Sequence, residues 1–66
     1  PLPFDHLEAV KCLEKCGEFY AQEGRWSMAA KNMKEIAEIY EKEASFDKAM
    51  AAYEKAAEYY EGDNAP

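Results

Sequence analysis

The chain is short of several residue types, and each shortage excludes a class of protein. Of its 66 residues, one is histidine, two are cysteine and three are proline, at positions 1, 3 and 66. Two cysteines are too few for a disulfide scaffold, so we expect a reducing compartment. One histidine and no glycine-rich phosphate loop argue against catalysis, a cofactor or a metal site. No apolar run approaches the roughly 20 residues of a membrane span, and no signal peptide is recognisable.

Basic residues are also scarce. Eight stand against fourteen acidic ones, which gives a formal charge of −6 and a pI near 4.6. An acidic chain is a poor partner for nucleic acid or anionic lipid. Hydrophobic residues nevertheless make up 48% of the chain, too many for a disordered segment. A chain of this length forms one domain at most, and its core is marginal without neighbours.

The pattern of breakers and helix formers predicts three helices. Residues 5–61 contain no proline and are rich in Ala, Glu, Lys and Met. Gly24 and Gly62 suit the position just past a helix end, and Ser45 suits an N-cap. Gly17 falls inside the first helix, where it costs about 1 kcal/mol against alanine unless close packing needs it. The predicted helices are 5–23, 26–43 and 46–61.

An internal repeat of 20 residues is the strongest pattern in the chain. Trp26 aligns with Phe46, and Gly24 aligns with Ala44. Three matching helical units at a fixed spacing indicate an α-solenoid. The recurring words are Cys16-Gly17-Glu18-Phe19-Tyr20, Ile36-Ala37-Glu38-Ile39-Tyr40 and Ala56-Ala57-Glu58-Tyr59-Tyr60.

The repeat also predicts which faces are buried. A row of small residues, among them Gly17, Ala37 and Ala57, would let the helices approach closely. A further stripe does not fit one core, and it carries Phe19, Ile39 and Tyr59 with Cys12 and Ala52. Because a solenoid helix has two buried faces, we expect a longer array, or self-association through Phe19, Ile39 and Tyr59. The rows expected in the core are Ala9, Leu13, Cys16 and Tyr20; Trp26, Ala29, Met33, Ile36 and Tyr40; and Phe46, Ala49, Tyr53, Ala56 and Tyr60.

The pattern is typical of tetratricopeptide repeats. That motif has about 34 residues per helix pair, or about 17 per helix, whereas this chain has 20 residues per helix. We therefore predict an all-α, TPR-like α-solenoid fragment of three antiparallel helices, with residues 1–66 as one segment. The ordered words resemble the middle of the soluble NSF attachment proteins, the SNAP family, and its α-type in particular. Those words are Glu8 to Leu13, Gly24 to Lys31, Ile36 to Glu41, Lys48-Ala49 leading to Tyr53-Glu54, and Ala57 to Gly62.

The resemblance implies a function that composition does not. SNAP proteins bind the four-helix SNARE complex along one face and recruit the hexameric ATPase NSF, which disassembles it. They act in membrane fusion and vesicle-mediated protein transport, including transport between ER and Golgi, and are cytoplasmic and peripheral on membranes. The resemblance implies a non-enzymatic adaptor segment here, with the NSF contact in parts of a parent outside these residues.

One basic segment stands out as a candidate binding site. Arg25, Lys31 and Lys34 lie in a ten-residue stretch without an acid, with a local charge of +3 against −9 for the remainder. Arg25 takes the place of Ser45 in the repeat, although arginine cannot cap helix N–H groups and opposes the helix dipole. The resemblance implies that Arg25 and Lys31 match residues that contact acidic SNARE side chains. Lys34 has no clear match, and we expect it to pair with Glu38 on the surface.

Two other functions stay open. A TPR-type module of another system would hold a peptide carboxylate in a groove, but Lys31, Asn32 and Lys34 form only one such cluster. A purely structural solenoid fragment is the other. Cys12 and Cys16 are interpreted as small buried residues, not as metal ligands or a disulfide.

Overall fold

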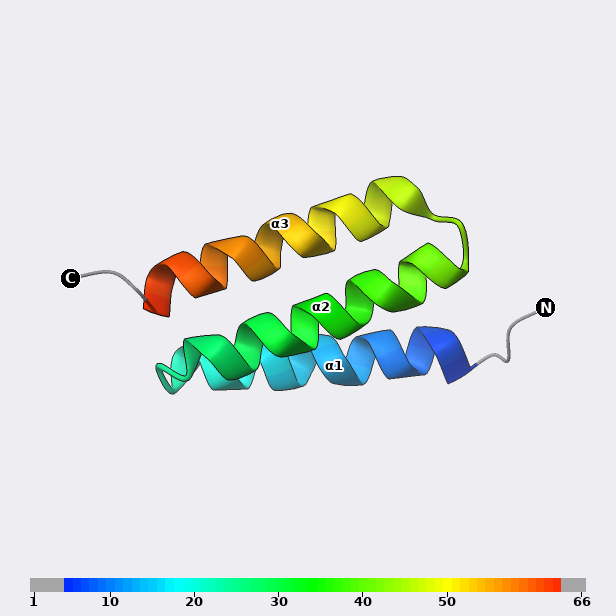
Figure 1. The fold of residues 1–66 in the computed structure, drawn as a ribbon. Helices are drawn as coiled ribbons and strands as arrows, with labels where there is room; N and C mark the ends of the chain where they lie inside the picture. The colour runs from blue at the N-terminus through cyan, green and yellow to red at the C-terminus, as the bar shows by residue number, and fades with distance from the viewer. Residues whose placement is uncertain (1–4, 64–66) are drawn as a thin grey trace.

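Three α-helices make up residues 5–63, the part of the chain that the computed structural model describes. They are α1 (Asp5–Gln22), α2 (Trp26–Lys42) and α3 (Phe46–Asp63). Successive helices run antiparallel, and α2 lies between α1 and α3, as Figure 1 shows. The predicted all-α fold is confirmed, and its helix bounds are correct to within two residues. None of the described helices has the length and apolarity that crossing a membrane requires.

The two turns between the helices are built alike, 20 residues apart. After α1, the amide of Arg25 donates to the carbonyl oxygen of Tyr20 at 2.8 Å. After α2, the amide of Ser45 donates to the carbonyl oxygen of Tyr40, also at 2.8 Å. These bonds are the long-range members of two Schellman motifs, which end a helix and reverse the chain. The sequence repeat is therefore also a repeat of backbone hydrogen bonding.

A left-handed residue ends each of the first two helices. Gly24 has φ of 77°, and its repeat equivalent Ala44 has φ of 61°. Glycine adopts this conformation freely, whereas alanine does so at a cost of about 1 kcal/mol. Gly24 therefore ends α1 as predicted. The prediction that Gly62 ends a helix is wrong, because α3 continues to Asp63. A Cβ at Gly62 would lie 3.3 Å from Cδ2 of Trp26, so this glycine suits the close approach of the indole.

The core is centred on α2, which packs against both neighbours, while α1 and α3 scarcely touch each other. Val10, Ile36, Ala37 and Ala52 form the buried cluster, with exposures of 5% or less. Leu13, Met33, Ile39 and Tyr40 pack around this cluster. Small side chains dominate the contact, so the helix axes come close and little apolar volume is buried.

The helices meet through two adjacent faces, which we call leading and trailing; α2 uses both, α1 uses only its trailing face and α3 only its leading face. The leading face contacts the preceding helix, and the trailing face contacts the following one. The leading faces consist of Ala29, Asn32, Ile36 and Ile39 on α2, and of Ala49, Ala52, Ala56 and Tyr59 on α3. The trailing faces consist of His6, Val10, Leu13, Gly17 and Tyr20 on α1, and of Trp26, Ala30, Met33, Ala37 and Tyr40 on α2.

The packing corrects the predicted rotation of α3. Phe46, Tyr53 and Tyr60 were expected in the core but are 64%, 37% and 45% exposed. Ala52 is buried and Tyr59 half-buried, although both were assigned to the uncovered stripe. The predicted row was wrong because it mixed residues of both faces of α3, and only the leading face meets α2.

Two further predictions also need correction, one about the stripe that carries Phe19, Ile39 and Tyr59, and one about the two cysteines. Phe19 is 59% exposed, as expected, but Ile39 packs against the core cluster and is half-buried. Cys12 and Cys16 are exposed free thiols, so their interpretation as buried packing residues is wrong. Gly17 is buried, as predicted. Both cysteines lie on α1 at positions equivalent to the leading face, which no helix covers within residues 5–63.

Candidate binding surfaces

Arg25 is exposed at the turn between α1 and α2 and is the N-cap residue of α2. Its carbonyl oxygen accepts the amide of Ala29 at 3.1 Å, while no side chain caps the free N–H groups of α2. No acidic residue lies in the first turn of this helix either. A cation at this end opposes the helix dipole by up to about 1 kcal/mol. The predicted departure from capping rules is therefore confirmed.

Lys31 is exposed and lies six residues further on, about 9 Å along the axis of α2. With roughly 100° of rotation per residue, its side of α2 is opposite to the side that carries Met33 and Tyr40. Lys31 therefore lies on the outer side of α2, in its second turn, while Arg25 is exposed at the turn that precedes the helix. Within residues 5–63, neither Lys31 nor Lys34 forms an ion pair, so the expected Lys34–Glu38 pair is absent.

A groove that the sequence analysis missed runs between α1 and α3, with α2 as its floor. Its walls carry opposite charges, with two carboxylates on α1 and two lysines on α3. The two ammonium groups lie over tyrosine rings, Lys48 at 5.7 Å from the Tyr40 centroid and Lys55 at 5.4 Å from that of Tyr59. The lining residues are Glu14, Glu18, Met33, Ile36, Tyr40, Lys48, Ala51, Ala52, Lys55 and Tyr59. We call it the inner groove.

The electrostatics of the inner groove act on Tyr40. Burial raises the pKa of its phenol above the ordinary 10.0, and the carboxylates of Glu14 and Glu43 raise it further. Glu43 in turn accepts from the ring of His6, with Nδ1 at 2.8 Å from Oε2. This contact joins the start of α1 to the end of α2. In the sequence, the acidic Glu14 and Glu18 of the first predicted helix and the basic Lys48 and Lys55 of the third are the signal that could have indicated this groove.

A second groove lies on the opposite side of α3, and we call it the outer groove. The Tyr53 hydroxyl donates to Oε1 of Glu41 at 2.9 Å, which fixes this side chain across the joint between α2 and α3. That hydrogen bond is the main cause that raises the pKa of Tyr53. Apolar side chains dominate the lining, which consists of Glu41, Phe46, Ala49, Met50, Tyr53, Glu54 and Ala57.

One aromatic contact and one buried polar side chain limit which residues are free to bind a partner. Trp26 packs against Tyr59 with ring centroids 5.9 Å apart, so it closes the joint between α2 and the last turns of α3. Asn32 is buried at 9% exposure against Gly17 and cannot join a cationic cluster with Lys31. Among the described residues, no three His, Cys, Asp or Glu side chains converge on a possible metal site. Exposed cations and open apolar grooves suit contacts with other proteins.

Fold and surfaces together define a helical-repeat protein of the TPR-like solenoid class. The chain belongs to the soluble NSF attachment protein (SNAP) family, whose family model matches residues 4–66. This match confirms the resemblance seen in the sequence, and the family is one of non-enzymatic adaptors. Comparison with curated proteins and with solved structures gave no match.

Proposed function

We propose that this chain is an adaptor segment of a SNAP-like protein that binds the assembled SNARE complex. In this proposal the parent protein recruits the NSF ATPase for SNARE disassembly, through parts other than residues 1–66. It works in the cytoplasm, peripherally on membranes, and the segment itself catalyses no reaction. The family match over residues 4–66 is the observation that carries the proposal.

Arg25 and Lys31 are the residues that we propose contact acidic SNARE side chains. Both are exposed, and neither pairs with an acid within residues 5–63. Arg25 also opposes the helix dipole, a cost that a binding role would explain. Such contacts would set the association rate and its salt sensitivity, with each pair contributing less than about 1 kcal/mol.

The inner groove supports a second candidate, a module that binds an acidic peptide in another system. Lys48 and Lys55 present two cations along one wall of an open groove. The opposite wall carries Glu14 and Glu18, which would repel a carboxylate. The cluster of Lys31, Asn32 and Lys34 cannot serve as a carboxylate clamp either, because Asn32 is buried. We therefore place this function second, ahead of a purely structural role.

A charge-reversal experiment tests the proposal and separates it from the peptide-binding alternative. A SNAP-family chain that carries this segment is used to pull down an assembled SNARE bundle, with Arg25→Glu and Lys31→Glu combined. We expect about a tenfold loss of affinity near physiological salt. The matched control combines Lys48→Glu and Lys55→Glu, which reverses the same number of charges in the inner groove.

The control variant is expected to bind the SNARE bundle like the unmodified chain. Equal losses in both variants would mean that only net charge matters, and the assignment of Arg25 and Lys31 would be wrong. Unchanged binding of the Arg25/Lys31 variant would also remove it. Binding of a free acidic peptide that only the Lys48/Lys55 variant loses would favour the alternative function.

A further inference from the structure

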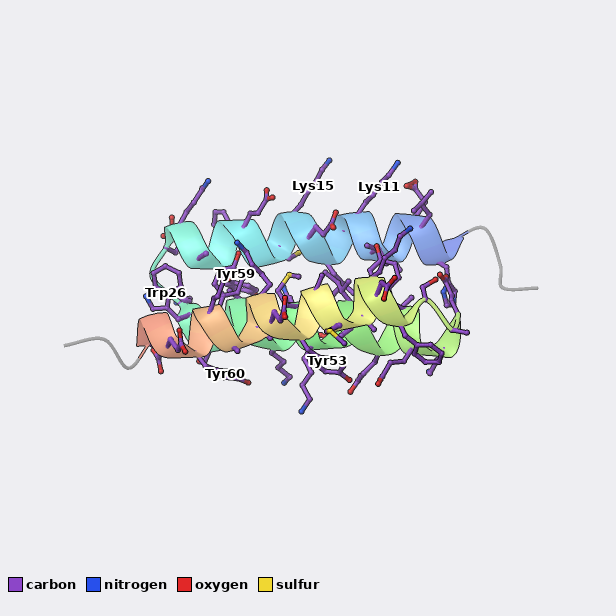
Figure 2. The ribbon with its side chains drawn as sticks, turned by 90° about the horizontal axis from the view of Figure 1, so that it is seen from above. Lys11, Lys15, Trp26, Tyr53, Tyr59 and Tyr60 are labelled. Atoms are coloured by element: carbon purple, nitrogen blue, oxygen red, sulfur yellow. The ribbon has the colours of Figure 1, made fainter. Side chains whose placement is uncertain are left out.

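The inner groove lies between two helices that scarcely touch, and all of its lining residues belong to α1, α2 and α3. Its volume is about 540 Å³, within the range of ligand-binding pockets, roughly 300 to 1,000 Å³. Figure 2 shows Tyr59 between α1 and α3, whereas Tyr53 and Tyr60 lie on the side of α3 that points away from α1. The inner groove is therefore distinct from the uncovered apolar face of α3.

The two contact faces of α2 determine the width of the groove. With about 100° of rotation per residue, the leading and trailing faces of α2 point in directions about 120° apart. Packed helices have axes 8–10 Å apart, which places the axes of α1 and α3 about 16 Å from each other. A helix packed at the usual distance from both α1 and α3 would also lie about 9 Å from α2. The groove therefore has the width of one further helix.

The floor of the groove is apolar and has the spacing of a helix-packing surface. Met33 and Tyr40 are half-buried and lie seven residues apart on α2, and Ile36, between them in sequence, is 1% exposed. On α3, Ala52 and Tyr59 also line the groove and are seven residues apart. Residues seven apart lie on one side of a helix, the arrangement through which two helices pack side by side. Such a floor suits the apolar stripe of an amphipathic helix.

The two walls select the charges of such a helix. Glu14 and Glu18 are exposed on the α1 wall, and Lys48 and Lys55 are exposed on the α3 wall. Within residues 5–63 no ion pair joins the walls, because Lys55 contacts Glu58 of its own helix at 3.8 Å and both ammonium groups lie over tyrosine rings. A helix with an acidic flank and a basic flank satisfies both walls, whereas a uniformly charged helix meets a like charge at one of them.

We propose that the inner groove binds a single amphipathic helix of another protein. The apolar stripe of this helix lies on α2, its acidic flank faces the lysines of α3, and its basic flank faces the glutamates of α1. The inference goes beyond the proposed SNARE contact, because Arg25 and Lys31 do not line the groove and Lys31 lies on the opposite side of α2. It does not depend on SNARE binding.

Synthetic helices test the order of charges. The two-flank probe is a fluorescently labelled peptide as long as α2, 17 residues, with leucine along its apolar stripe, glutamate along one flank and lysine along the other. Two comparison peptides carry glutamate on both flanks or lysine on both flanks. In fluorescence anisotropy with the 66-residue chain near physiological salt, we expect the two-flank probe to bind about tenfold more tightly than either comparison peptide. Tighter binding of the all-glutamate or the all-lysine peptide would overturn the proposal, and the all-glutamate result would favour the acidic-peptide alternative.

Charge reversal in the chain locates the site. Lys48→Glu combined with Lys55→Glu makes both walls acidic, so we expect the two-flank probe to bind about tenfold more weakly and the all-lysine peptide to bind more tightly. A loss for one peptide with a gain for the other cannot result from unfolding. The matched control combines Lys11→Glu with Lys15→Glu, which reverses the same number of charges on side chains that extend from α1 away from α3 in Figure 2. The control is expected to bind the two-flank probe like the unmodified chain.

Three results would overturn the proposal. Equal losses in the groove variant and the control would mean that only net charge matters. Undiminished binding of a two-flank probe whose leucines are replaced by glutamine would show that the apolar floor is not used. Self-association of the chain that Lys48→Glu with Lys55→Glu abolishes would assign the groove to a second copy of this chain.

Discussion

Among single residues, Arg25 and Ser45 occupy the same place in the repeat and differ in chemistry. Each follows a left-handed residue and donates its amide to a tyrosine carbonyl five residues earlier. The backbone carbonyl oxygen of each residue then accepts the first amide hydrogen bond of the next helix. The backbone hydrogen bonding at this position is therefore the same whether the side chain is arginine or serine. Arginine can be kept there for binding at a modest cost in stability.

That cost can be measured with Arg25→Ser. We expect the free energy of unfolding to rise by about 1 kcal/mol, because serine accepts a free N–H group and a cation leaves the positive end of the helix. Urea unfolding followed by circular dichroism measures the change. The control Lys31→Ser, inside α2, should bring no gain. A less stable Arg25→Ser chain would contradict the capping argument.

Tyr53 and Tyr40 predict how stability depends on pH. The hydrogen bond to Glu41 raises the pKa of Tyr53, and burial raises that of Tyr40, both from 10.0. Above pH 10.0 the folded chain therefore binds more protons than the unfolded chain, so the free energy of unfolding falls as pH rises through the folded-state values. Urea unfolding between about pH 9 and about pH 11 measures this fall.

Two variants identify the part of this pH dependence that belongs to Tyr53. Tyr53→Phe and Glu41→Gln should each make the loss of stability at high pH shallower, since one removes the phenol and the other its charged acceptor. Phenolate absorbance should show one late-titrating tyrosine fewer in Tyr53→Phe. An unchanged slope in both variants would show that this hydrogen bond does not persist in solution.

Among the elements, the joint between α1 and α2 differs from its repeat equivalent in one respect. Gly17 stands where α2 and α3 have Ala37 and Ala57. A Cβ at Gly17 would lie 3.7 Å from the Cβ of Asn32 and 3.8 Å from the carbonyl oxygen of Ala29, which is ordinary van der Waals contact. The close packing of this joint therefore tolerates a methyl group.

Gly17→Ala is accordingly expected to stabilise the chain by up to about 1 kcal/mol, the difference in helix propensity between the two residues. Chemical denaturation measures it. Gly17→Leu is the comparison variant, and we expect it to lose about 1–3 kcal/mol because its side chain overfills the joint. If Gly17→Ala were destabilising, α1 and α2 would have to approach more closely than the structure shows.

For the whole molecule, stability depends on how many helix faces find a partner. The buried side chains are mostly alanines, and Ile36 is the one large side chain below 2% exposure in the part of the chain described. So small a core leaves a marginal stability, which association can raise by mass action. If the uncovered faces associate, the stability of the folded chain therefore depends on its concentration.

We expect helicity and the midpoint of thermal unfolding to rise with protein concentration, as association through the uncovered faces stabilises the folded chain. Circular dichroism over a range of concentrations measures both. Met50→Glu should lose this dependence, and Ala51→Glu should keep it. A midpoint that is independent of concentration in the unmodified chain would show that one copy is stable alone.

The sequence determined the features that arise within one helix or one turn. The lack of internal proline, the abundance of helix formers and the left-handed Gly24 act over a few residues, so the three helices could be predicted closely. The repeat of 20 residues follows from the same local signals. So does the prediction that Arg25 occupies an N-cap position that its side chain cannot cap. Lys31 and Arg25 as SNARE contacts stay a prediction.

Only the tertiary structure decided which apolar row of each helix meets a neighbour. Phe46 and Ala49 lie on adjacent rows of α3 that look equally apolar in the sequence, and packing buried Ala49 while leaving Phe46 exposed. In the same way, packing leaves Cys16 of α1 exposed. It also places Lys48 of α3 and Glu14 of α1 on opposite walls of the inner groove. The rotation of a helix about its axis depends on contacts between residues far apart in the chain. Local propensity and periodicity contain no information about such contacts.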